Sequence, residues 1–67
     1  MDLIEKLKKE YLELGEKTVR LNYFLINEKD TVSDTQYTLL LAQVSAMSAY
    51  VQILAIRIKD LEEHHAN

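Results

Sequence analysis

The stretch that decides the fold is YTLLLAQVSAMSAYVQILAIRIKDL, residues 37–61. Its apolar residues recur at alternating spacings of three and four, which is the period of one face of an α-helix. The face keeps a heptad pattern over eight consecutive positions: Tyr37, Leu40, Val44, Met47, Val51, Leu54, Ile58 and Leu61. This pattern predicts a single long helix over residues of about 34–63.

The same helix is apolar on more than this one face. No charged residue occurs between Asp34 and Arg57. Further apolar or small residues lie away from the main face: Leu39, Ala42, Ala46, Tyr50, Ile53 and Ile56. A helix that is apolar most of the way round is buried most of the way round, and one neighbouring helix covers one face. The rest must be covered by other copies or by another protein.

The N-terminal half predicts a second helix, over residues of about 2–27. Its apolar face has the same alternating spacing: Ile4, Leu7, Tyr11, Leu14, Thr18, Leu21 and Leu25. Asp2 is suited to cap the helix N-terminus, with Glu5 three residues later.

The predicted linker covers residues 28–33 and ends in a helix start signal. Ser33 and Gln36 have the spacing of a capping box, and Val32 and Tyr37 have the spacing of a hydrophobic staple. A connection this short favours antiparallel neighbours.

The expected fold class is therefore all-α: one domain over residues 1–67, an antiparallel two-helix hairpin that assembles into a helical homo-oligomer. The residues predicted at the oligomer interface are Tyr37, Leu40, Val44, Met47, Tyr50, Val51, Leu54 and Ile58.

Composition supports self-association. A chain of 67 residues has little apolar burial with which to offset its conformational entropy, so it usually needs disulfides, a metal or a partner chain. The chain has no Cys, which excludes disulfides and thiolate metal sites. Its net charge of −3 argues against a DNA or RNA partner. Lys6, Lys8 and Lys9 interrupt any apolar N-terminal segment, so we expect no signal peptide.

Enzyme chemistry is not expected. The only histidines are His64 and His65, near the end of the second helix, where a frayed tail is the simplest interpretation. The sequence has no glycine-rich phosphate loop, and its one Glu-x-x-His spacing, Glu62 to His65, lies in this tail and not at the inward-facing positions that build metal sites in helical bundles. We therefore expect no catalytic residue, no metal and no cofactor.

One face of the first helix is a candidate binding surface. It carries Lys8, Tyr11, Gly15, Thr18 and Asn22 at helical spacing. Glycine inside a helix costs about 1 kcal/mol relative to alanine, so something is expected to approach the backbone there. That object is either another helix or a flat ligand stacked on Tyr11. In the second case Lys8, with Arg20 or Lys29 from a neighbouring subunit, can meet a phosphate.

A particular set of residues extends through both predicted helices, from about residue 7 to 61. It consists of Glu10 to Leu14, Glu16-Lys17, Leu21, Phe24-Leu25, Val32-Ser33, Gln36, Leu39-Leu40, Gln43, Ala46-Met47, Tyr50, Ile53-Leu54 and Arg57-Ile58. In these residues the sequence resembles a family of short phage-encoded helical proteins that includes the anti-CBASS sponges, which bind cyclic oligonucleotide immune messengers without cleaving them.

The resemblance implies a hexameric helical assembly with ligand pockets between subunits. It also implies that a base stacks on an aromatic residue of the first helix, here Tyr11, and that basic side chains such as Lys29 hold the phosphates. The ligand-binding residues expected overall are Lys8, Tyr11, Gly15, Asn22 and Lys29. The expected ligand is a cyclic di- or trinucleotide, and the expected setting is the cytoplasm of an infected bacterial host.

Two other functions stay open. The chain is alternatively a structural or protein-binding helical oligomer with no small-molecule ligand. The third alternative is a membrane protein, because the uncharged stretch is long enough to cross a bilayer. Gln43 and Gln52 lie inside that stretch and argue against lipid contact, so we expect no membrane partner.

Overall fold

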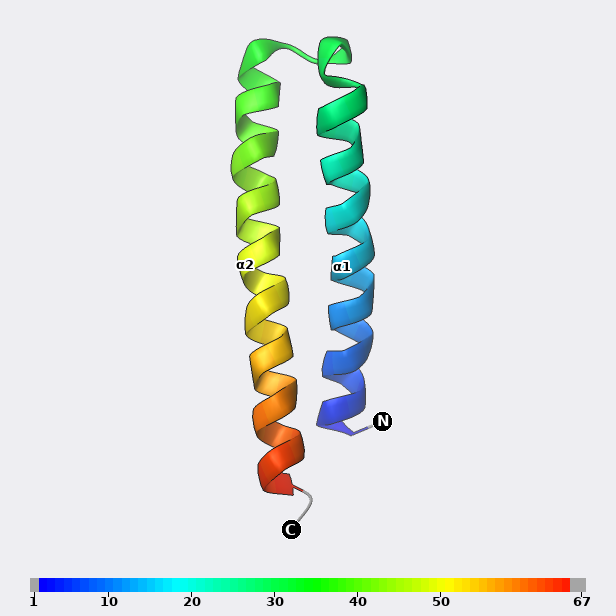
Figure 1. Cartoon of the computed structure of the whole chain (residues 1–67), viewed down its shortest axis with the longest axis vertical. Helices are drawn as coiled ribbons and strands as arrows, with labels where there is room; N and C mark the ends of the chain where they lie inside the picture. Colours follow the sequence, from blue (N-terminus) through cyan, green and yellow to red (C-terminus); the bar gives the residue numbers. More distant parts are fainter. Residues whose placement is uncertain (1, 66–67) are drawn as a thin grey trace.

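The protein is a hairpin of two long helices. The computed structural model describes the backbone of residues 2–65 and the side chains of residues 2–64. Helix α1 (Leu3–Asn27) and helix α2 (Asp34–His65) are joined by a short 3-10 helix, η1 (Lys29–Thr31). The helices lie side by side, with the start of α1 and the end of α2 opposite the connection (Figure 1). This confirms the all-α hairpin expected from the sequence.

Both helices begin at the expected capping residues. The Asp2 carboxylate accepts a hydrogen bond from the Glu5 backbone N–H at 2.8 Å. The Ser33 hydroxyl accepts one from the Gln36 backbone N–H at 3.1 Å. Each bond satisfies a backbone donor that has no partner within the helix. The linker contains a turn that the sequence analysis did not anticipate, in which the Thr31 backbone N–H donates to the Glu28 carbonyl at 3.0 Å.

The two predicted apolar faces meet as one seam between α1 and α2. Every residue of both faces is buried or half-buried. Leu54 is the most buried residue of the seam, at 0% exposed, and it forms the core with Leu7 and Ile58 toward the N-terminal end of α1 and the C-terminal end of α2. The hydroxyl of buried Thr18 donates to the Leu14 carbonyl at 2.7 Å, so the seam carries no unpaired hydroxyl at this point.

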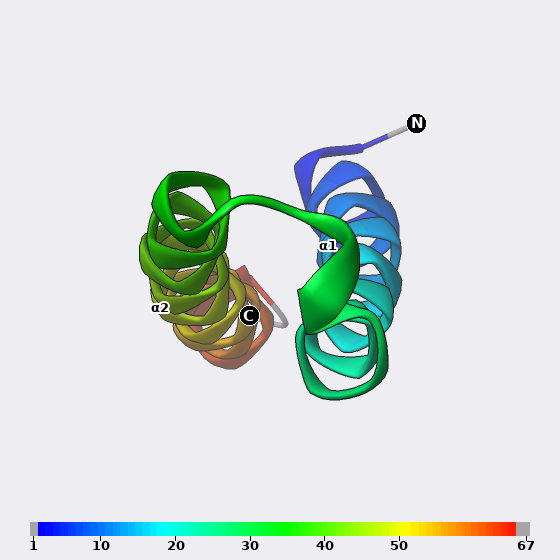
Figure 2. The same ribbon diagram turned by 90° about the horizontal axis from the view of Figure 1, so that it is seen from above.

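This seam is thin, and the molecule is elongated. Its extents are 52 × 16 × 15 Å, and the radius of gyration is 15.3 Å. A compact domain of this length has a radius of gyration of about 11 Å. Seen from above, the hairpin is two inclined rods in a single layer (Figure 2). Each helix therefore keeps an outer face that the other helix does not reach.

Helix α2 leaves the larger apolar surface uncovered. Among the described residues it is the one helix that is long and apolar enough to cross a membrane by length and composition, with a mean hydropathy of 1.8 over its most apolar window. Only 6% of that window is buried inside the hairpin. A helix in the core of a soluble assembly is equally long and apolar, and partner chains then cover the surface that the hairpin leaves exposed.

Polar contacts flank the seam on its two opposite sides. On one side the Lys8 ammonium lies 2.9 Å from the Glu62 carboxylate. On the other side the Tyr50 hydroxyl donates a hydrogen bond to the Glu10 carboxylate. That hydrogen bond is the main reason why the pKa of Tyr50 is raised above its ordinary value, and the negative charge of Glu10 adds to the effect.

We predict that Leu54→Ala destabilises the protein by about 2 to 5 kcal/mol, because it removes buried methyl groups and leaves a cavity in the core of Leu7, Leu54 and Ile58. Chemical denaturation followed by circular dichroism, at one fixed protein concentration, measures the change. Leu3→Ala is the matched control, since Leu3 is 52% exposed and its loss should change stability by roughly 0.5 kcal/mol or less. Equal effects of the two substitutions would contradict the seam as the main source of stability.

The Tyr50–Glu10 hydrogen bond predicts a dependence on alkaline pH. Because folding raises the pKa of Tyr50, the bond stabilises the protein below the ordinary tyrosine pKa of 10.0 and is lost as the pH rises through the raised value. Ultraviolet titration of the phenols should therefore show one tyrosine ionising late. Glu10→Gln should move that ionisation to lower pH, whereas Glu13→Gln should not. An unchanged titration in Glu10→Gln would refute the assignment.

Candidate ligand groove

One side of the hairpin is hollowed between α1 and α2. The hollow has a volume of about 490 Å³, which is within the range of small-molecule sites. It is lined by Tyr11, Leu12, Gly15, Glu16, Val19, Arg20 and Val51. Its floor is apolar, and its two charged residues, Glu16 and Arg20, both come from α1.

A second, smaller hollow continues from the first. It shares Gly15, Val19 and Val51 with its neighbour and adds Thr18, Ser48 and Gln52. Its volume is about 300 Å³. We name the two hollows together the Gly15 groove, because Gly15 lines both. The groove runs along the seam and offers hydroxyl and amide groups at the α2 side.

Gly15 keeps this groove open. A Cβ atom added to Gly15 would meet no atom of the chain within 4 Å. Nothing in the hairpin itself therefore requires glycine here, and the residue only lowers helix stability. The close approach expected from the sequence must come from outside the chain. Both interpretations stay open on this point: a helix of another copy and a flat ligand.

Tyr11 joins the groove to the core. It is half-buried, packs against the cluster of Leu7, Leu54 and Ile58, and also lines the groove. An aromatic ring held in this way has few conformations left to lose when it binds a ligand. A ring with one side on a core and one side on a groove is suited to stack against another planar group.

One cation, Arg20, lines the groove, a second, Lys8, lies one helical turn from the lining residue Tyr11, and carboxylates hold both only weakly. The Arg20 guanidinium lies 3.9 Å from the Glu16 carboxylate, with both side chains more than half exposed. Lys8 is one helical turn from Tyr11 and pairs with Glu62. Exposed ion pairs contribute about 0 to 1 kcal/mol. An incoming anion can therefore exchange with either carboxylate at little cost.

The structure brings together only part of the predicted ligand site. Tyr11 and Gly15 line the groove, whereas Lys8 is not among the lining residues and pairs with Glu62. Asn22 is exposed and is not among the lining residues. Lys29 lies in η1, about 27 Å along the helix axis from Tyr11, since the two are 18 residues apart at about 1.5 Å each. A shared site for Lys29 and Tyr11 therefore needs a second copy of the chain.

Several groove residues were not singled out as ligand contacts from the sequence: Leu12, Glu16, Val19 and Val51. The sequence could have indicated Leu12 and Val19 as ligand contacts, because they are apolar residues off the main face on either side of Gly15. The sequence offered no such indication for Val51, since its heptad position assigned it only to the inner face of α2. Its place in the groove depends on how α2 lies against α1.

The residues predicted at the oligomer interface lie mostly on the inner face of α2. Leu54 and Ile58 are covered within one chain, at 0% and 8% exposure. These two therefore lack the free surface that contact with another copy requires, because α1 already covers them. Tyr50 is different, at 42% exposure. The interface itself stays a prediction, and the exposed residues of α2 are better placed to form it.

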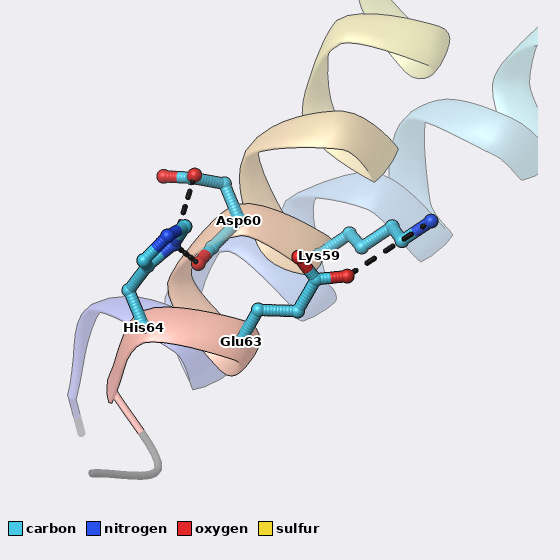
Figure 3. A network of polar contacts seen from close by, with 4 residues as sticks. All are labelled: Lys59, Asp60, Glu63 and His64. Atoms are coloured by element: carbon cyan, nitrogen blue, oxygen red, sulfur yellow. Dashed lines mark hydrogen bonds and ion pairs between the residues drawn. The ribbon is translucent and has the colours of Figure 1, made fainter.

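The C-terminal histidine that the structure describes is tied to its own helix. The Nδ1 atom of His64 lies 2.8 Å from the Asp60 carbonyl and 3.1 Å from its carboxylate, beside the Lys59–Glu63 pair (Figure 3). The His65 side chain lies outside the described residues. Within residues 2–64 no group of three or more acidic or histidine side chains is placed to hold a metal ion.

Comparison with known proteins gives one result. A family model described as Sequestin matches residues 1–60, which include the seam, the groove and the linker. Searches of curated proteins and of solved structures returned no match. The match confirms the family resemblance inferred from the sequence.

We predict that Gly15→Ala stabilises the free protein by about 1 kcal/mol, because alanine is the better helix former and its methyl group enters open space. Thermal or chemical denaturation without ligand measures this. Ala55→Gly, at an exposed site of α2, is the reverse control and should destabilise by a similar amount. Destabilisation by Gly15→Ala would mean that another copy already occupies the groove in the free protein.

Proposed function

The chain belongs to the Sequestin family, and from this premise we propose that it sequesters a cyclic di- or trinucleotide messenger of bacterial antiphage immunity. Family membership indicates sequestration rather than catalysis. The proposed mechanism is stoichiometric capture in the cytoplasm of an infected host, without cleavage of the messenger. Capture without turnover requires the protein to be in excess and its Kd to lie below the messenger concentration.

The Gly15 groove is the observation that carries this proposal. Its volume of about 490 Å³ suits part of a nucleotide, and its floor of Tyr11, Val19 and Val51 is apolar. A nucleobase is flat and gains about 1 to 3 kcal/mol by stacking on an aromatic side chain. The missing side chain at Gly15 lets such a plane lie next to the helix backbone.

Arg20 and Lys8 are the proposed phosphate contacts within one chain. A guanidinium can bind a phosphate with two parallel hydrogen bonds, and an ammonium adds a point charge. They are 12 residues apart, about 18 Å along α1, so both can hold one ligand only if their long side chains extend toward each other. In this proposal Lys29 reaches the phosphates only from a neighbouring copy, which places the complete pocket between subunits. A few cations in a groove can attract anions although the whole chain is acidic.

Isothermal titration against cyclic dinucleotides, cyclic trinucleotides and the matching linear dinucleotides tests the proposal. We expect at least one cyclic ligand to bind and to be recovered intact. Tyr11→Ala should weaken its binding by about 1 to 3 kcal/mol through lost stacking. Tyr23→Ala is the control, because Tyr23 is a tyrosine of the same helix outside the groove and is 66% exposed. An absence of heat across the panel at tens of micromolar protein would rule the proposal out.

The alternative function is a helical module that binds only protein. The observation in its favour is the exposed apolar surface of α2, which no residue of α1 covers. Small molecules released from heat-denatured protein and identified by mass spectrometry separate the two functions. A nucleotide released from the wild type and missing from Tyr11→Ala supports the sponge, whereas an empty protein with unchanged assembly supports the module.

A further inference from the structure

The Gly15 groove has a polar rim on each of its two helices. Neighbouring residues of an α-helix point about 100° apart, so Glu16 borders Gly15 on the side away from the seam and forms the rim on α1. The rim on α2 consists of Ser48 and Gln52, and the floor between the rims is apolar. A flat ligand stacked on Tyr11 therefore turns one edge toward the Glu16 carboxylate and another toward a hydroxyl and an amide.

The two rims differ in the hydrogen bonds that they can form. A serine hydroxyl and a glutamine amide each donate and accept, whereas a carboxylate only accepts. The rim on α2 therefore suits almost any edge of a nucleobase. The rim on α1 suits only an edge that offers N–H donors, which makes Glu16 the groove residue that can discriminate between bases.

The Glu16 carboxylate is held near the groove but keeps its capacity to accept hydrogen bonds. Its ion-pair partner, the Arg20 guanidinium, lies 3.9 Å away, whereas a hydrogen bond between such charged groups spans about 2.7 to 2.9 Å. The Glu16 side chain is also 72% exposed. Both carboxylate oxygens are therefore open to a ligand, while the charge of Arg20 offsets part of their negative charge.

A carboxylate in this place opposes an anionic ligand unless the ligand bonds to it. Every phosphate of a cyclic nucleotide is negative, and like charges repel. A base that donates two N–H groups converts the carboxylate into a favourable contact, because charge-assisted hydrogen bonds are roughly twice as strong as neutral ones. Guanine has two adjacent donors, N1–H and the amino group at C2. Adenine has its amino group next to the N1 lone pair, which repels a carboxylate.

We propose that Glu16 makes the Gly15 groove selective for guanine, an inference that rests on the sequestration function proposed above. Guanine stacks on Tyr11 and donates N1–H and one amino N–H to the two carboxylate oxygens of Glu16. Its N7 atom, on the other side of the ring system, accepts from the Ser48 hydroxyl or the Gln52 amide. A bidentate pair of this kind discriminates against the wrong base by about 5- to 150-fold in Kd.

Isothermal titration with cyclic di-GMP and with cyclic di-AMP tests the selectivity through the ratio of their two Kd values. We expect the wild type to bind cyclic di-GMP about 5- to 150-fold more tightly. Glu16→Gln should abolish this preference, because an amide offers one donor and one acceptor, the pattern that suits adenine. The substitution also removes a negative charge, but this changes both Kd values alike and cancels in their ratio.

Glu13→Gln is the matched control. Glu13 is an exposed carboxylate of the same helix and is not among the residues that line the groove. This variant loses the same charge and should keep the wild-type ratio. Circular dichroism should show equal helix content in both variants and the wild type, since substitutions at exposed sites change stability little.

The outcomes separate the selectivity from the sequestration function. Equal Kd values for the two ligands in the wild type, tighter binding of cyclic di-AMP, or a ratio unchanged by Glu16→Gln would overturn the selectivity and leave sequestration standing. Binding of a cyclic triadenylate alone would have the same consequence, since that ligand has no guanine. No binding of any cyclic nucleotide would instead refute sequestration, and the selectivity with it.

Cyclic di-IMP separates hydrogen bonding from stacking. Its base keeps N1–H but lacks the amino group of guanine, so it can form one of the two bonds to Glu16. We expect its Kd for the wild type to lie between those of the other two ligands. In Glu16→Ala neither bond can form, so cyclic di-IMP and cyclic di-GMP should bind equally. Equal binding of these two ligands by the wild type would overturn the proposed pairing.

Discussion

The structure depends on a seam that is one side chain wide. Leu54 packs against Leu7 and Ile58 toward the N-terminal end of α1, and most of the remaining contact extends from there toward the linker. Two helices cannot enclose a volume, so within residues 2–64 water is excluded completely from one side chain, Leu54, in the seam. Its width explains why both helices keep apolar outer faces and why the chain is suited to partners.

The groove is a direct consequence of that geometry. Two cylinders in contact leave a furrow on either side of the contact line, and side chains decide how far each furrow is filled. On one side Tyr50 and Glu10 close it with a hydrogen bond. On the other side Gly15 leaves it open, while Tyr11 and Val51 provide an apolar floor. The two sides of the hairpin are therefore chemically distinct, although the backbone is nearly symmetrical.

Sequestration of a ligand requires little more of a protein than such a surface. No group has to titrate in a functional pH range or transfer a proton, and Tyr50, whose pKa is raised by its hydrogen bond to Glu10, lies on the side away from the groove. A protein that sequesters such a ligand needs a preorganised aromatic ring, cationic side chains that can exchange a carboxylate for the ligand, and a way to keep the ligand from water. A short hairpin has the first two in Tyr11 and in the weakly held Arg20 and Lys8. Enclosure is the property that a single thin layer lacks and that additional copies can supply.

Periodicity and capping chemistry by themselves determined the helices, the faces that meet and the starts of both helices. Residues from Leu7 to Leu61 could be assigned to the seam because burial in a helix repeats every three or four residues, and Asp2 and Ser33 could be assigned as caps because the rule is local. The tertiary structure decided which residues of different helices come together, including Lys8 with Glu62, Tyr50 with Glu10 and Val51 with Gly15. These pairings depend on the axial register and inclination of α1 and α2. Register is set by the fit of side chains along the whole seam, which no local pattern contains.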